Sequence, residues 1–167
     1  MSERRITRRQ FMVRGTGLLG GLITAMVSVP AIGFLLSPLW ATTPLLWADV
    51  QGGPIDDIPE DKPTARIASI QTETNPPQPP VSRVVYVVKH QGQLYAFSNI
   101  CTHMQCDVHW DASLDLFECP CHGGLYSITG RNVGGPPPQP LPQWVHRTQV
   151  RGGRTYLQVA NRLREEI

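Results

Sequence analysis

The fold and chemistry of this sequence are decided by two stretches, Cys101-Thr-His103-Met-Gln-Cys106 and Cys119-Pro-Cys121-His122-Gly-Gly124. Each stretch offers one Cys and one His at close spacing, together with a further Cys, and fifteen residues separate His103 from Cys119. Two thiolates and two imidazoles can hold a tetrahedral zinc ion, or an iron–sulfur cluster in which His replaces Cys on one iron. Zinc modules usually place like ligands together, as in Cys-x2-Cys. The mixed pair in each stretch therefore favours the cluster.

The spacing Cys101-x-His103 with Cys119-x2-His122 resembles the signature of Rieske 2Fe-2S proteins, in the version found in quinol-oxidising cytochrome bc complexes. The likeness continues through Tyr126, Gly130-Arg131 and Gly135-Pro136-Pro137. It implies one 2Fe-2S cluster of the Rieske type. By the same resemblance, Cys101 and Cys119 bind one iron, and His103 and His122 bind the other iron, which lies nearer the surface.

The resemblance also assigns roles around the ligands. Cys106 and Cys121 are expected to form a disulfide that ties the two loops together, which agrees with a total of four cysteines. Such a bond needs an oxidising compartment. The phenol of Tyr126 is expected to donate a hydrogen bond to Cys101. The segment Gly134-Gly-Pro-Pro-Pro138 corresponds to the proline-rich loop that covers the cluster in the family.

The implied function is that of a membrane-anchored Rieske subunit. It would accept one electron from a quinol at the cytochrome b site, with release of a proton, and pass it to a c-type cytochrome. The chain would thus be the electron-transfer subunit of a quinol-cytochrome c oxidoreductase. In the family, the histidine at the position of His122 receives the hydrogen bond from the quinol, and His103, the other exposed ligand, is expected to share this role.

Gly124 stands where many family members carry a serine, whose hydroxyl donates a hydrogen bond to a bridging sulfide. Glycine has no such donor, so the reduced cluster is stabilised less and a lower reduction potential is expected. A lower potential suits a donor more reducing than ubiquinol. Menaquinol is the expected donor, as in bacterial menaquinol-cytochrome c reductases.

Two other interpretations remain open from the residues. The first is the Rieske small subunit of an exported molybdoenzyme of the arsenite oxidase type, in which another subunit supplies the electrons and quinol does not dock. The Gly-Arg and Gly-Pro-Pro segments and a long hinge favour the bc-type interpretation. The second is a structural zinc module with two spare cysteines, which an assay for iron and sulfide would distinguish.

The N-terminal region has the composition of a membrane anchor. Five arginines and one glutamate precede Gly15, and no charged residue follows until Asp49. The twenty-two residues from Gly15 to Leu36 would span about 33 Å as a helix, which matches a hydrocarbon core of about 30 Å. The arginines predict that the N-terminus stays in the cytoplasm and that the head lies on the other side of the membrane. The membrane is expected to be the inner membrane of a bacterium.

Thr7-Arg8-Arg9-Gln10-Phe11 also resembles a twin-arginine export signal, which would carry a folded protein with its cluster already inserted. The alternative is that the arginines only orient the helix. Val29-Pro30-Ala31 is a poor cleavage site, so an uncleaved anchor is expected. The net charge is +2, and the absence of a basic face interleaved with aromatic residues argues against nucleic acid as a partner.

The remaining chain predicts a mainly β head. Four parts are expected: a cytoplasmic twin-arginine segment at 1–14, a transmembrane helix at 15–37, a hinge or linker at 38–63, and a Rieske head at 64–167 made of an antiparallel β domain with inserted cluster-binding loops. Strand patterns and turn signals predict two hairpins and one short strand within the insertion. The strands are expected at 65–70, 83–88, 93–97, 114–118, 144–151 and 154–160.

Overall fold

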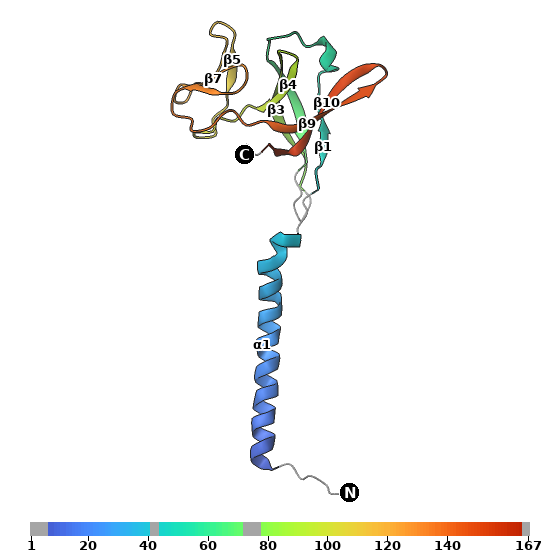
Figure 1. Ribbon diagram of the computed structural model, residues 1–167, viewed down its shortest axis with the longest axis vertical. Helices are drawn as coiled ribbons and strands as arrows, with labels where there is room; N and C mark the ends of the chain where they lie inside the picture. The colour runs from blue at the N-terminus through green and yellow to red at the C-terminus, as the bar shows by residue number, and fades with distance from the viewer. Residues whose placement is uncertain (1–6, 41–43, 72–77, 165–167) are drawn as a thin grey trace. The chain divides into compact units, whose positions relative to one another are not determined.

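A computed structural model describes residues 7–40, 44–71 and 78–164. The chain divides into two compact units between Thr43 and Pro44: a long N-terminal helix and a β-rich head, which is the upper part of Figure 1. The elements are α1 (Arg8–Trp40), β1 (Trp47–Asp49), a 3-10 turn η1 (Ile55–Asp57), β2 (Thr64–Ile70), β3 (Val81–His90), β4 (Gln93–Ser98), β5 (His109–Asp111), β6 (Leu116–Cys119), β7 (Gly124–Tyr126), β8 (Asn132–Gly134), β9 (Trp144–Arg151) and β10 (Arg154–Leu163).

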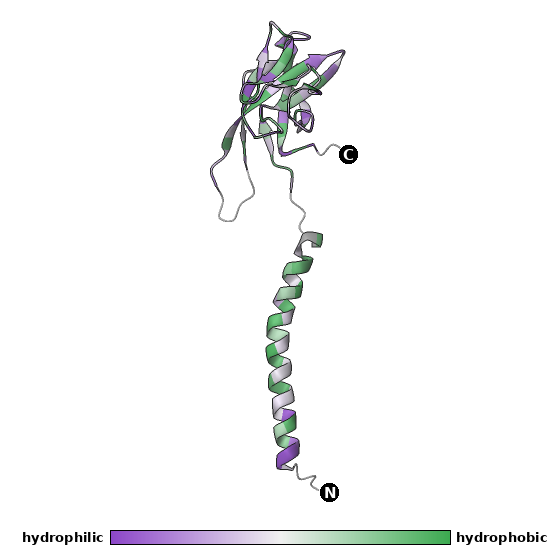
Figure 2. Ribbon diagram, turned by 90° about the vertical axis from the view of Figure 1, so that its left-hand side faces the viewer, coloured by the Kyte–Doolittle hydropathy of each residue, from purple (hydrophilic) through white to green (hydrophobic). Residues whose placement is uncertain are grey.

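The helix α1 begins with a capping box. The Thr7 hydroxyl accepts a hydrogen bond from the Gln10 backbone N–H at 3.3 Å, and the Gln10 side chain accepts one from the Thr7 N–H at 3.2 Å. Figure 2 shows a hydrophilic start and a largely apolar surface beyond it. By length and composition, the helix can cross a membrane from Arg8 to Ser37, although an N-terminal signal sequence would pass the same test.

Two three-stranded antiparallel sheets form the base of the head, in the orders β1-β10-β9 and β2-β3-β4. Val85 and Val87 of β3 pack against Leu157 and Val159 of β10 in one buried apolar cluster. Both predicted hairpins are confirmed. They turn through Gln91-Gly92 and Gly152-Gly153, and all four residues have positive φ, as the tight turn between twisted strands requires.

The insertion between β4 and β9 is a separate four-stranded antiparallel sheet in the order β5-β6-β7-β8. Its core is aromatic: Phe97, Phe117 and Tyr126 are fully buried, and the Phe97 and Phe117 rings meet edge to face at 5.9 Å. The short strand predicted at 114–118 lies at Leu116–Cys119 instead. Leu114 and Asp115 belong to the preceding turn, where Asp115 has a φ of 52°, so the strand begins two residues later than predicted.

The hinge predicted over 38–63 differs from the structure. Strand β1 pairs with β10 from Trp47 to Asp49, and Val50, Ile55 and Ile58 are buried in the core of the head. The reason is that these apolar side chains are buried in the same apolar cluster as residues of both base sheets. Only residues 41–46 lie between the end of α1 and the first strand of the head.

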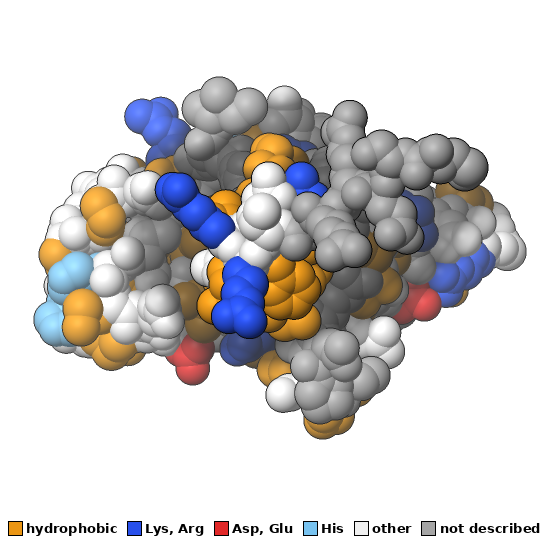
Figure 3. Space-filling view, turned by 90° about the horizontal axis from the view of Figure 1, so that it is seen from below, with side chains coloured by type: hydrophobic (Ala, Val, Ile, Leu, Met, Phe, Trp, Pro, Cys, Tyr) orange, Lys and Arg blue, Asp and Glu red, His pale blue; other side chains and the backbone are white. Residues whose placement is uncertain are grey.

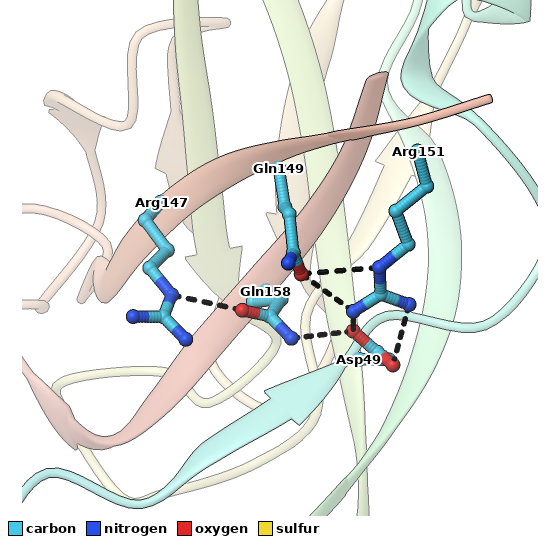
Figure 4. Close-up of polar contacts among 5 residues, drawn as sticks. All are labelled: Asp49, Arg147, Gln149, Arg151 and Gln158. Atoms are coloured by element: carbon cyan, nitrogen blue, oxygen red, sulfur yellow. Dashed lines mark hydrogen bonds and ion pairs between the residues drawn. The ribbon is translucent and has the colours of Figure 1, made fainter. Parts of the chain in front are cut away.

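Polar contacts fix the beginning of the head as well (Figure 4). Arg151 of β9 holds the Asp49 carboxylate through both of its terminal nitrogens, at 3.0 and 3.1 Å, and Gln158 of β10 donates to the same carboxylate at 2.7 Å. The bond from Arg151, followed by the one from Gln158, lowers the pKa of Asp49. Three strands are thus joined around one carboxylate, and Asp49 belongs to the head rather than to a linker.

Candidate metal centre

Two loops at one end of the head carry the predicted ligands. The first follows β4 and closes on itself, since the Cys101 N–H donates to the Cys106 carbonyl at 2.9 Å and the Gln105 N–H donates to the Cys101 carbonyl at 3.1 Å. The second joins β6 to β7 and closes through the Gly123 N–H and the Cys119 carbonyl at 3.1 Å. Each loop therefore fixes its own backbone before any metal is added.

The four predicted ligands are brought together in two layers. The side chains of Cys101 and Cys119 are each 2% exposed, and their thiols lie close enough to hydrogen-bond to each other. His103 and His122 are exposed, and their ring centroids lie 4.9 Å apart. Figure 3 shows histidine side chains on the surface at one end of the head, beside hydrophobic side chains. A buried pair of sulfurs is thus combined with an exposed pair of imidazoles.

The two thiols differ in acidity. Burial raises the pKa of Cys101. Hydrogen bonds from the Tyr126 hydroxyl and from the backbone N–H groups of His103 and Met104 lower this pKa by more than burial raises it, so the net shift is downward. The pKa of Cys119 is raised, first by burial and then by the hydrogen bond and the charge of the neighbouring Cys101. Cys101 is therefore the more acidic of the two thiols.

Tyr126 connects the first loop to β7. Its hydroxyl lies 3.2 Å from the Cys101 sulfur and accepts a hydrogen bond from the Thr102 backbone N–H, also at 3.2 Å. Since that oxygen already accepts from Thr102, its own proton is available to Cys101. The ring is fully buried, and burial followed by the nearby Cys101 raises the pKa of the phenol. Tyr126 therefore remains a hydrogen-bond donor at ordinary pH.

A disulfide joins Cys106 of the first loop to Cys121 of the second, which is the pairing implied by the family resemblance. Cys119 lies next to this bond, and the three sulfur atoms fall within 4.8 Å of one another. That group of three is not a metal site, because two of its sulfurs are already bonded to each other. The disulfide instead fixes the distance between the loops.

The proline-rich segment packs against the second loop. Pro137 is buried, and a Cβ added at Gly124 would lie 2.6 Å from the Pro137 Cγ. A Cβ at Gly135 would lie 2.3 Å from the Gly123 carbonyl oxygen. Asn132 holds the segment by donating to the Pro137 carbonyl at 3.1 Å. The absence of a side chain at Gly124 is therefore what allows this close contact.

Sequence reasoning missed two residues at this site. The hydroxyl of Thr102 donates to the Gln139 carbonyl at 2.8 Å, so the first loop is joined to the chain just beyond the prolines, and Asn132 anchors the prolines from β8. Neither residue belongs to a ligand pattern, and no sequence signal indicated them. The remaining histidines lie elsewhere, with partners of their own: His90 with Asp61, His109 with Glu118, and His146 with the Trp144 carbonyl.

The profile of the Rieske [2Fe-2S] domain matches residues 50–145, which include both loops, the disulfide and the proline-rich segment. The chain belongs to the Rieske [2Fe-2S] family. The match starts at Val50, a residue that is buried in the core of the head although the sequence predicted it to lie in the hinge.

Similar proteins are known from several organisms. The cytochrome b6-f complex iron-sulfur subunit of Chlorobaculum tepidum is 31% identical over 92% of this chain and 76% of its own length. The menaquinol:cytochrome c reductase iron-sulfur subunit of Bacillus subtilis is 32% identical over 91% of each chain. The crystal structure of the plasma membrane Rieske protein of Synechocystis PCC 6803 is 31% identical and covers 55% of this chain and 84% of its own, with a TM-score of 0.37.

The cofactor of this Rieske protein is one 2Fe-2S cluster, and the residues present fit it. A Rieske centre needs two thiolates on one iron and two imidazoles on the other. The structure supplies two buried thiols that lie outside any disulfide and two exposed imidazoles beside them. Backbone N–H groups and a phenol already point at the sulfurs. This donor set alone would also suit zinc, and the family assignment is what argues against the structural zinc module.

Proposed function

We propose that this chain is the membrane-anchored Rieske subunit of a quinol-cytochrome c oxidoreductase. It accepts one electron from a quinol, with release of a proton, at a site shared with a cytochrome b subunit, and passes the electron to a c-type cytochrome. The observation that carries the proposal is the exposed imidazole pair, His103 and His122, above the buried thiols. Relatives named as subunits of such complexes, at 31% and 32% identity, support it.

Within this proposal, Cys101 and Cys119 would hold one iron of the cluster, and His103 and His122 would hold the other. The cluster supplies one-electron transfer when bound. Cys101 and Cys119 are buried, so water is kept from the sulfur side of the site. Tyr126 donates a hydrogen bond to Cys101 and stabilises negative charge there. The disulfide between Cys106 and Cys121 keeps the two pairs of ligands at a fixed separation.

The histidines handle the proton. An imidazole that binds iron through one ring nitrogen keeps the other for hydrogen bonding. In our proposal, the outer nitrogen of His122 accepts the hydrogen bond from the quinol hydroxyl and takes its proton. His103 lies with its ring centroid 4.9 Å from that of His122 and shares this role. Because both rings are exposed, quinol can reach them without any opening of the head.

We propose menaquinol as the donor. The reason is Gly124, which places no hydroxyl beside the cluster, so that fewer donors stabilise the reduced state than in family members with serine. The space that a side chain would use is taken by Pro137. Tyr126 keeps its donor to Cys101, which limits the decrease in potential. The Bacillus subtilis relative, named as a menaquinol:cytochrome c reductase subunit, supports the assignment.

We further propose that α1 is an uncleaved single-pass anchor in a bacterial inner membrane. Its arginine-rich start lies in the cytoplasm, the twin-arginine segment at 1–14 directs export, and the head lies on the other side. The span is proposed at 15–37. Reorientation of the head relative to α1 would use a hinge that follows α1. Leu46 already belongs to the head, since its N–H donates to the Asn161 Oδ1 at 3.1 Å and its carbonyl accepts from the Asn161 N–H at 3.0 Å, so the proposed hinge precedes Leu46. Arg4 and Arg5 lie outside the described residues.

The test is a redox titration followed by EPR on the purified full-length protein, together with reduction by a menaquinol analogue in the assembled complex. We expect a Rieske signal with a midpoint in the middle or lower part of the family range of about −150 to +300 mV. His122→Ala should abolish both the signal and quinol oxidation. Retained quinol oxidation in this variant would refute the mechanism, and a midpoint near the top of the range would refute menaquinol as the donor. An intact signal without quinol oxidation by the assembled wild-type complex would indicate instead the small subunit of a molybdoenzyme.

A further inference from the structure

A buried thiol lies directly against a disulfide in this head. The sulfur atoms of Cys106, Cys119 and Cys121 fall within 4.8 Å of one another, and Cys106 is bonded to Cys121. Cys119 is 2% exposed and lies outside any disulfide. Cys101, the other thiol, does not belong to this group of three sulfurs. Thiol–disulfide exchange needs only a thiolate that can reach one sulfur of the bond. The exchange therefore starts from sulfur atoms that already lie within 4.8 Å of one another.

We propose that Cys119 attacks this disulfide whenever the cluster is absent, so that the bond moves from Cys106–Cys121 to Cys106–Cys119. The Cys119 thiolate forms a bond to the Cys106 sulfur, the bond between Cys106 and Cys121 breaks, and its electron pair leaves on the Cys121 sulfur. Cys119 loses one proton to water and Cys121 gains one. The step contains no net oxidation or reduction, and no other reactant is needed.

The attack is directed at Cys106 rather than at Cys121. Cys119 and Cys121 are two residues apart, and a bond between them would close a very small ring, against the geometry that a disulfide prefers. Cys106 comes from the other loop, so the new bond would still tie the two loops together. The released sulfur belongs to Cys121, an exposed residue, and water stabilises its thiolate. Uncatalysed rearrangements of this kind take minutes to hours.

The consequence concerns the order of maturation, and it rests on the proposed role of Cys119 as an iron ligand. A Cys119 sulfur bound to iron is not available for attack, so the cluster protects the disulfide beside it. Conversely, a head that forms its disulfide without a cluster consumes Cys119 and loses a ligand. Cluster insertion must therefore precede the joining of Cys106 and Cys121. This order suits a head that receives its cluster in a reducing compartment and its disulfide after export.

The experiment compares loaded and cluster-free protein. Full-length protein in detergent is first shown to carry the Rieske EPR signal, and one half is then stripped with an iron chelator, anaerobically and without added thiol. Both halves are incubated for hours, alkylated, digested and mapped by mass spectrometry. We expect the stripped sample to convert most of its Cys106–Cys121 bond to Cys106–Cys119, with Cys121 alkylated, while the loaded sample keeps the original bond. Stripped protein that retains Cys106–Cys121, with Cys119 alkylated, would overturn the proposal.

Two variants provide a matched control, since each lacks one thiol and neither can hold the cluster. Cys101→Ser leaves the three-sulfur group intact and should show the Cys106–Cys119 bond, whereas Cys119→Ser should keep Cys106–Cys121. Equal pairing in the two variants would contradict the proposal, and the stripped wild type provides the same test should either variant fail to fold. The two proposals are tested by different measurements. A missing EPR signal in the starting material would refute the proposed electron-transfer function, whereas the sulfur pairing found by mass spectrometry tests the exchange.

Discussion

Replacement of Tyr126 by Phe removes a single buried hydroxyl whose effect on the cluster can be calculated. The oxygen lies 3.2 Å from the Cys101 sulfur, and the ring is fully buried, so no water can take its place. A net hydrogen bond contributes about 1–1.5 kcal/mol. The reduced cluster is the more negative state and benefits more from the donor. If the hydrogen bond stabilises only the reduced cluster, its loss should lower the midpoint potential by roughly 40–65 mV, because about 1.4 kcal/mol corresponds to 59 mV for one electron.

The assay is an EPR-monitored redox titration of wild type and Tyr126→Phe. Tyr95→Phe is the control, because it removes a phenol hydroxyl that donates to Gln93 at 2.7 Å, away from the ligands, and should leave the potential unchanged. Tyr126→Phe also deprives the Thr102 N–H of its acceptor, so a loss of stability of about 1–3 kcal/mol should accompany the shift. An unchanged or higher potential in Tyr126→Phe would refute the donor role that we assign to the phenol.

Two further predictions concern stability. Gly124→Ala places a methyl group 2.6 Å from the Pro137 Cγ and should reduce the stability of the head by about 1–3 kcal/mol, measured as a lower temperature for loss of the cluster's visible circular dichroism. Gly134→Ala in the neighbouring strand is the control, because its methyl group makes only an ordinary 3.4 Å contact and should change the stability little. Equal effects of the two substitutions would contradict the packing argument. The bond from Arg151 lowers the pKa of Asp49 below its ordinary value of 3.8, so the ionised carboxylate stabilises the head at any pH above 3.8. This contribution is lost as the pH falls through the lower pKa of the folded state. Asp49→Asn should therefore lower the thermal midpoint at pH 7 by an amount equivalent to less than about 1 kcal/mol, since both side chains are half exposed, and a difference that persisted at pH 2–3 would argue against the ion pair.

The β character of the head followed from local patterns. Turn residues such as Gln91-Gly92 and Gly152-Gly153 need positive φ and lie between β-branched runs, so both hairpins were predictable from neighbouring residues alone. The segment 38–63 was predicted as a linker because its acidic residues look solvated, although its residues 47–58 belong to the head. Its few apolar side chains, Val50, Ile55 and Ile58, matter only once β10 and β3 provide a surface to bury them. That surface comes from strands well beyond this segment in the chain, and those of β10 lie about a hundred positions away, so it leaves no local signal.

The sequence by itself determined which residue types meet at the proposed centre, because the ligands can be recognised from short spacings such as Cys101-x-His103. It also predicted a helix long and apolar enough to cross a membrane, because this property depends on continuous composition. Only the tertiary structure decided which groups surround the ligands: the Tyr126 phenol at Cys101, Pro137 in the space beside Gly124, and the Cys119 thiol against the disulfide. These contacts join separate loops of the insertion, so they depend on how those loops fold onto one another rather than on any short spacing.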